Sequence, residues 1–97
     1  MFEKVNLVIS FEVKNVRKFQ DLIVTILGNE YVIPNHRSLT ITIDRGNYDL
    51  LFKIPFLIKT ARLEHHLALK GDMHLEIGWS KMWGRITVKE IVTHVTL

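Results

Sequence analysis

Apolar and polar side chains alternate at the beginning of the chain. From Val5 to Val13 every odd-numbered position is apolar, whereas the even-numbered positions are mostly polar. Successive side chains of a β-strand point to opposite faces of a sheet, so a period of two buries one face and exposes the other. The pattern therefore predicts a half-buried strand over residues 3–13.

The period changes after position 15. Apolar residues recur at spacings of three and four between positions 16 and 26, which would place them along one side of an α-helix. Asn15 precedes this stretch and Gly28 follows it, as expected of an N-cap residue and of the left-handed residue that ends many helices. The sequence therefore predicts a helix over residues 16–27.

Alternation returns in two pairs of segments further along the chain. Residues 38–44 and 47–54 form the first pair, and residues 61–69 and 73–79 form the second. Each pair is joined by a short connection that contains a glycine. Because such connections commonly join antiparallel neighbours, we expect two β-hairpins with apolar residues facing apolar residues.

The remaining segments carry weaker signals. Residues 29–37 show no clean period and are interpreted as a loop with a short edge strand at 31–33. The stretch 56–65 fits either a helix that opens at Pro55 or the approach to a strand. A last strand is expected over residues 85–95.

These elements predict one α+β domain that covers residues 1–97. The expected element order is β-α-β-β-β-β-β, with the helix packed on a mostly antiparallel sheet. A length of 97 residues suits a single domain. The apolar fraction of 47% and the charged fraction of 24% are ordinary for a globular chain, which argues against disorder.

The composition narrows the functional classes. The chain has no cysteine, which excludes disulfides, zinc–thiolate sites and thiol nucleophiles. Because small secreted domains commonly depend on disulfides, this also favours a cytoplasmic location. No apolar run is long enough to span a bilayer, so we expect no membrane partner. The net charge of +3 permits an acidic partner without requiring one.

Motifs for catalysis are close to absent. Gly78 to Met82 begins like the nucleophile elbow of hydrolases, but Met82 stands where the second glycine must allow a tight turn. There is no glycine-rich phosphate loop, no HExxH and no paired acidic motif. The sequence therefore predicts a non-enzymatic protein without a cofactor.

Histidines gather in the second predicted hairpin. His66, His74 and Glu76 would share its exposed face, where facing Cβ atoms lie about 5 Å apart. They are weak candidates for a metal site, because a flat sheet face encloses an ion poorly. Pairing on a wet surface explains them better, and no metal site is predicted. His65 is expected on the apolar face, hydrogen-bonded near a sheet edge.

A segment near the C-terminal end combines aromatic and cationic side chains. Lys81, Met82, Trp83 and Arg85 lie in the connection before the last strand, whereas Trp79 continues an apolar stripe and is expected in the core. Exposed aromatic rings beside cations suit single-stranded nucleic acid. Tryptophan and methionine are equally typical of protein–protein interfaces.

A second basic group lies around the start of the predicted helix. Lys14, Arg17 and Lys18 are cations at a helix end that favours negative charge. This local conflict suggests a phosphate-binding role. Together with the segment that ends at Arg85, these residues support one hypothesis, a nucleic-acid-binding module.

The other hypothesis is a small protein-interaction or inhibitor module that self-associates, of the kind that viruses and mobile elements encode as accessory proteins. Val8, Val24 and Leu51 lie on faces that the predicted registers leave open to solvent. Such apolar positions would form an exposed patch or the interface of a homo-oligomer. The small charge excess favours this hypothesis over nucleic-acid binding.

Overall fold

The computed structural model describes residues 3–14, 21–56 and 58–92, and in these residues the chain forms eight β-strands and no helix. The described part of the protein is therefore all-β, and the predicted α+β fold is wrong. The strands are β1 (Lys4–Phe11), β2 (Leu22–Ile26), β3 (Asn29–Ile33), β4 (Arg37–Asp44), β5 (Gly46–Pro55), β6 (Thr60–Leu69), β7 (Met73–Ser80) and β8 (Arg85–Val92).

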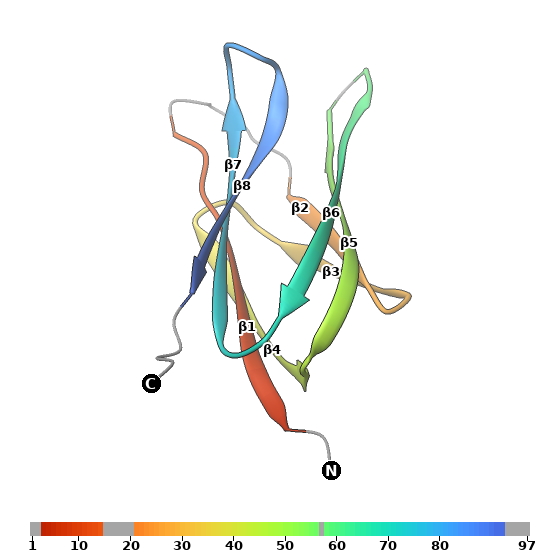
Figure 1. Cartoon of the computed structure of the whole chain (residues 1–97). Helices are drawn as coiled ribbons and strands as arrows, with labels where there is room; N and C mark the ends of the chain where they lie inside the picture. Colours follow the sequence, from red (N-terminus) through yellow and green to blue (C-terminus); the bar gives the residue numbers. More distant parts are fainter. Residues whose placement is uncertain (1–2, 15–20, 57, 93–97) are drawn as a thin grey trace.

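Two four-stranded sheets pack face to face (Figure 1). The first has the strand order β4-β1-β7-β8 and the second has the order β3-β2-β5-β6. β1 runs antiparallel to β4 and parallel to β7, with Leu7 between Ile41 and Met73. The remaining neighbours are all antiparallel. Each sheet thus has two edge strands: β4 and β8 in the first, β3 and β6 in the second.

The core lies between the sheets and is built by the alternation in the sequence. In β1 the odd-numbered residues Leu7, Ile9 and Phe11 are fully buried, as predicted. Phe52 of β5 and Leu67 of β6 are buried from the opposite sheet. No polar or charged residue is buried among the described residues, so apolar burial is the main stabilising term of this fold.

The predicted helix over 16–27 is wrong where the structure describes it, since Leu22–Ile26 is strand β2; residues 15–20 lie outside the described residues. Leu22 and Ile26 fit both a helical stripe and an alternating one, and Leu22, Val24 and Ile26 are the buried set. The β-branched run from Ile23 to Ile26 favours the strand. Leu27 and Gly28, both with positive φ, make the turn to β3 rather than a helix end.

The first predicted hairpin is also wrong. Residues 38–44 and 47–54 do form strands, but β4 pairs with β1 and β5 pairs with β2 and β6. The chain crosses from one sheet to the other at Arg45, and the Tyr48 hydroxyl donates to the carbonyl oxygen of Asp44 beside the crossing. Alternation specifies which face a residue occupies but not which strand lies beside it.

The second predicted hairpin fails for the same reason. β6 pairs with β5, whereas β7 pairs with β1 and β8. Residues 70–72 connect the sheets, and the Asp72 side chain accepts a hydrogen bond of 2.8 Å from the Asn6 backbone at the crossing. The short strand expected at 31–33 is confirmed as part of edge strand β3. The helix alternative for 56–65 is wrong, because β6 begins at Thr60.

Among the residues that the structure describes, no helix is of the length and apolarity that a membrane crossing requires.

Candidate functional site

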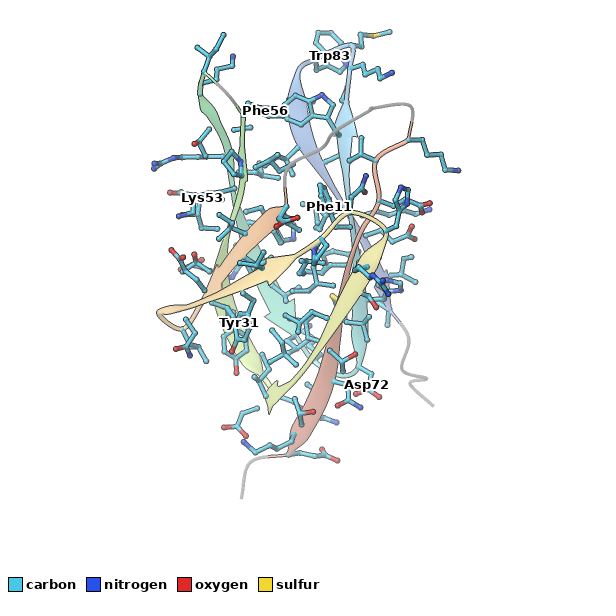
Figure 2. The ribbon with its side chains drawn as sticks, turned by 180° about the vertical axis from the view of Figure 1, so that it is seen from behind. Phe11, Tyr31, Lys53, Phe56, Asp72 and Trp83 are labelled. Carbon is cyan, nitrogen blue, oxygen red and sulfur yellow. The ribbon has the colours of Figure 1, made fainter. Side chains whose placement is uncertain are left out.

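Two hairpin tips from different sheets lie at the same end of the sandwich. Figure 1 shows the connection between β5 and β6 and the connection between β7 and β8 at the same end. In Figure 2, Phe56 and Trp83 lie near this end, whereas Asp72 lies toward the other. A shallow groove runs between the tips, lined from one side by Phe56 and Arg62 and from the other by Trp79 and Arg85.

An aromatic pair forms the wall of this groove. The ring centroids of Phe56 and Trp79 lie 5.1 Å apart, with the ring planes tilted by 58°, a favourable arrangement for two aromatic side chains. Both residues pack against the core as partly buried side chains. The groove is therefore an extension of the core that opens at the end of the molecule.

Local backbone bonds hold the two tips in shape. The Phe56 backbone N–H donates to the Lys59 carbonyl at 2.8 Å, and the Gly84 N–H donates to the Ser80 carbonyl at 2.7 Å. Gly84 adopts a φ of 60°, a conformation that glycine takes without steric cost. The Ser80 hydroxyl accepts from the Trp83 N–H at 3.2 Å. Met82 and Trp83 thus stand on a turn that two hydrogen bonds close.

Large apolar side chains project from both tips. Ile58 is 93% exposed, Met82 83% and Trp83 70%. Single exposed apolar residues are common, but a group of them at one end of a small domain indicates an interaction site. Water contact with these side chains is unfavourable, so a partner that covers them gains free energy on binding.

The same end is strongly basic. Residues 54–63 and 77–88 contain Lys59, Arg62, Lys81 and Arg85 and no Asp or Glu. All four cations are exposed. Cations gathered in segments that contain no Asp or Glu raise the local electrostatic potential and attract anionic partners. We call this end the hairpin-tip surface and define it as Phe56, Ile58, Lys59, Arg62, Trp79, Lys81, Met82, Trp83 and Arg85.

The structure brings together part of the predicted binding set. Lys81, Met82, Trp83 and Arg85 lie on the hairpin-tip surface, and Trp79 is half-buried at its base. Lys14 is exposed after β1, which runs parallel to β7 toward the same end. Arg17 and Lys18 lie outside the described residues. The helix terminus proposed for these three cations is not shown, because the described part of that segment is strand.

Four of the nine residues of this surface lie outside the segments predicted to bind a partner. Phe56, Ile58 and Lys59 were expected in an irregular approach to a strand and Arg62 in that strand, and none of the four was predicted as a binding residue. They join Trp83 only because β5–β6 and β7–β8 come from facing sheets. A usable signal was present, since both segments lack carboxylates and both contain exposed apolar residues.

The weak metal candidates do not come together. His66 lies on the outer face of the β3-β2-β5-β6 sheet, where its Nδ1 is 2.9 Å from the Asp49 carboxylate. His74 and Glu76 lie on the outer face of the other sheet. The prediction that these three residues share one sheet face is wrong. No group of three or more possible metal ligands occurs among the described residues.

The self-association positions also separate. Val24 is fully buried, so its predicted solvent exposure is wrong. Val8 and Leu51 are half-buried on the outer faces of opposite sheets. They cannot form one patch with each other, and self-association remains a prediction that needs another surface.

Two polar constellations resemble parts of catalytic sites. The Ser10 hydroxyl lies 2.8 Å from His74 Nε2, the distance of a nucleophile and its base. The pair lies on an outer sheet face, and among the described residues no carboxylate bonds to His74. A cross-strand hydrogen bond accounts for the contact.

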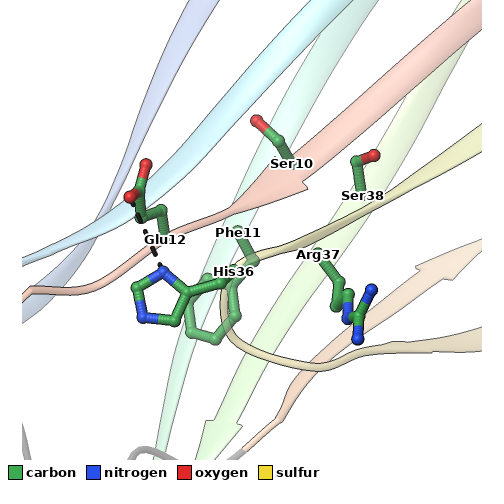
Figure 3. Close-up of a pocket in the computed structure, with 6 residues that line it drawn as sticks. All are labelled: Ser10, Phe11, Glu12, His36, Arg37 and Ser38. Carbon is green, nitrogen blue, oxygen red and sulfur yellow. Dashed lines mark ion pairs between the residues drawn. The ribbon is translucent and has the colours of Figure 1, made fainter.

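A polar hollow at the ends of β1 and β4 is the second constellation. It is lined by Ser10, Glu12, His36 and Ser38 among others (Figure 3). His36 Nδ1 lies 3.6 Å from the Glu12 carboxylate, whereas both serine hydroxyls point away from the imidazole (Figure 3). The positive φ of His36 follows from the turn closed by Arg37 N–H and Pro34 C=O at 3.1 Å. The hollow thus shows turn geometry rather than an activated nucleophile.

His65 lies where the sequence predicted it, on the inner side of β6 near a sheet edge. Its Nε2 is 2.8 Å from the Glu90 carboxylate of β8. This contact joins the edge strands of the two sheets. It is a structural link across the sandwich and does not belong to the hairpin-tip surface.

Comparisons with protein-family models, with curated proteins and with solved structures give no significant match to this chain. The function must therefore be argued from the chemistry of the hairpin-tip surface.

Proposed function

We propose that this protein is a non-enzymatic interaction module that binds an acidic, partly apolar segment of a partner protein through the hairpin-tip surface. The observation that carries the proposal is the position of two tips at one end of the sandwich (Figure 1); they expose apolar side chains and lie in segments with four cations and no Asp or Glu. The lack of cysteine favours the cytosol as its compartment.

The residue types match those that dominate protein interfaces. Tryptophan and arginine are the residues that most often supply binding energy, and methionine adapts to varied partners. Trp83, Met82 and Arg85 lie within one turn and its flank. The groove beside Phe56 and Trp79 offers a place for an apolar side chain of the partner, while Lys59 and Arg62 would face its carboxylates.

The aliphatic residues favour a protein over nucleic acid. Ile58 and Met82 are among the most exposed large apolar side chains that the structure describes, and neither stacks on a base or contacts a phosphate favourably. Trp83 and the cations would suit single-stranded nucleic acid. That partner is therefore treated as a distinct outcome of the experiment below.

The experiment selects peptides from a displayed random library on the immobilised protein. We expect enrichment of Asp and Glu next to aromatic or aliphatic residues, followed by binding measured as fluorescence anisotropy of a labelled peptide. The double variant Trp83→Ala/Arg85→Ala should weaken binding by roughly tenfold or more, because loss of a central interface residue costs at least 1.4 kcal/mol.

A matched control changes the same residue classes elsewhere. Leu27→Ala/Lys70→Ala removes an exposed apolar side chain and a cation outside the hairpin-tip surface and should leave affinity unchanged. Equal losses in both double variants would contradict the proposal. Salt-sensitive binding of oligo-dT or oligo-U that only the Trp83→Ala/Arg85→Ala variant loses would instead identify a nucleic-acid-binding module.

A further inference from the structure

The edge strand β4 differs in composition from the other three edges. β3 contains Glu30, β6 contains Arg62 and Glu64, and β8 contains Lys89 and Glu90. In β4 the six residues 38–43, Ser-Leu-Thr-Ile-Thr-Ile, carry no charge, no proline and no glycine. Charges on edge strands normally prevent one sheet from pairing with another. The six central residues of β4 lack this protection.

The inner side of β4 is only partly covered. Leu39, Ile41 and Ile43 point toward the core but are half-buried. Their neighbours on β1, such as Leu7 and Ile9, are 0% exposed. Apolar surface of the core therefore remains partly exposed to water along this edge, and one further strand would bury it.

The backbone of β4 also has a free side. The Arg45 N–H donates to the Glu3 carbonyl at 3.3 Å, which makes these facing residues a hydrogen-bonded pair of the β1–β4 ladder. Such pairs recur at every second residue of an antiparallel ladder. Thr40 and Thr42 therefore direct their N–H and C=O groups away from β1, toward the side on which no described strand pairs with β4.

We propose that β4 pairs antiparallel with β4 of a second copy of this chain, so that two sheets join into one of eight strands across a two-fold axis at Ile41. In this register Ile41 faces Ile41 of the second copy, and Leu39 faces Ile43 on the inner side. Thr40 faces Thr42 on the outer side. Every apolar residue meets an apolar residue, and every threonine meets a threonine.

The pattern of the strand favours a second copy as the occupant over an unrelated strand. β4 is complementary to itself in polarity, because the alternation of apolar residues and threonines is the same in both directions from Ile41. The charged ends do not add to the match, since Arg37 lies opposite Arg45 of the second copy and Asp44 lies opposite Ser38. The register is fixed by the apolar and threonine positions, because a slip by one residue would set Ile41 against Thr40. The interface lies apart from the hairpin-tip surface and does not rest on the proposed function.

Single cysteines test the register directly, since the natural chain has none. In the proposed dimer Ile41 faces itself in a non-hydrogen-bonded pair, with Cα atoms about 4.5 Å apart, within the range that a disulfide spans. Under mild oxidation the Ile41→Cys variant should form covalent dimers. Thr87→Cys, on the exposed outer face of edge strand β8, is the matched control and should stay monomeric.

Sedimentation equilibrium tests the association without cysteines. The mass should rise with concentration from 11.4 kDa toward twice that value. Thr40→Pro should weaken association by roughly tenfold or more, because it removes a donor from the free side while leaving the β1–β4 ladder intact. Trp83→Ala/Arg85→Ala should leave association unchanged, which separates this proposal from the hairpin-tip proposal.

Two results would overturn the dimer. One is a mass of 11.4 kDa at all concentrations together with no disulfide from Ile41→Cys. The other is covalent dimerisation of Thr87→Cys as efficient as that of Ile41→Cys, since random collision and not a defined register would then explain both.

Discussion

The two open sides of the sandwich differ in how far their inner side chains are buried. At one side β6 and β8 are linked by the contact between His65 and Glu90 at 2.8 Å. Ile86 of β8 and Leu67 of β6 are almost completely buried there, and Leu63 and Val88 are half-buried. At the other side β3 and β4 leave Tyr31 and Ile41 half-buried. A two-sheet fold that does not close into a barrel must protect its edges. This chain protects one edge with polar contacts and leaves the other suited to a partner.

The largest expected difference concerns two matched isoleucines on the inner faces of the two edges. Ile86→Ala should lower the free energy of unfolding by about 3 kcal/mol, because Ile86 is 3% exposed and the substitution leaves a cavity. Ile41→Ala should cost roughly 1 kcal/mol in dilute solution, because water already reaches this half-buried side chain. Urea unfolding measures both values.

Protein concentration provides the control for that comparison. If β4 associates, the stability of the unchanged protein should rise with concentration, and Ile41→Ala should suppress this rise while Ile86→Ala should not. Equal losses for the two alanine variants in dilute solution would show that the two edges are covered alike, contrary to the structure.

The next effect in size is the link that closes the β6–β8 edge. His65→Ala or Glu90→Ala should each lower the free energy of unfolding by about 1 kcal/mol, since the side chains are 23% and 40% exposed and the contact is partly shielded from water. The double variant should lose less than the sum of the single losses, with a coupling of roughly 0.5 kcal/mol.

A second histidine–carboxylate pair, comparable with His65–Glu90, lies on an exposed surface. His66 and Asp49 lie 2.9 Å apart with side chains 65% and 91% exposed. Their alanine variants should change stability by less than about 0.5 kcal/mol, because exposed pairs contribute little. A coupling for His66–Asp49 as large as that for His65–Glu90 would argue that bridging the two sheets adds nothing to the contact.

The sequence predicted positions along the fold better than it predicted neighbours. Alternation placed Leu7, Leu67 and Leu75 on buried faces, and all three are buried. It failed to pair the strands, because a short connection such as Arg45 serves a crossing between sheets as well as a hairpin. The helix failed because a short apolar run such as Leu22–Ile26 fits both periods, and its β-branched residues then decide for a strand.

For the candidate site too, the sequence indicated residues close together in the chain but not those brought together by strand pairing. Trp83 and Arg85 are close in sequence, so their combination was visible before the structure. Phe56 and Arg62 join them through the facing of two sheets, which depends on a strand pairing that the sequence predicted wrongly. The self-association prediction was tied to a register as well, and Val24 became a core residue once β2 was paired between β3 and β5.

The smallest expected effect on folding is also the one that separates the two edges most cleanly. Thr40 of β4 and Thr87 of β8 are both exposed threonines on outer faces of edge strands. Replacing either by lysine should change the free energy of unfolding of the monomer by no more than about 0.5 kcal/mol. Only Thr40→Lys should weaken association, because it places like charges near each other across the proposed two-fold axis, where a lysine protects an edge. Sedimentation equilibrium at matched concentrations measures the molecular mass of both variants. Equal masses for the two lysine variants would contradict association through β4.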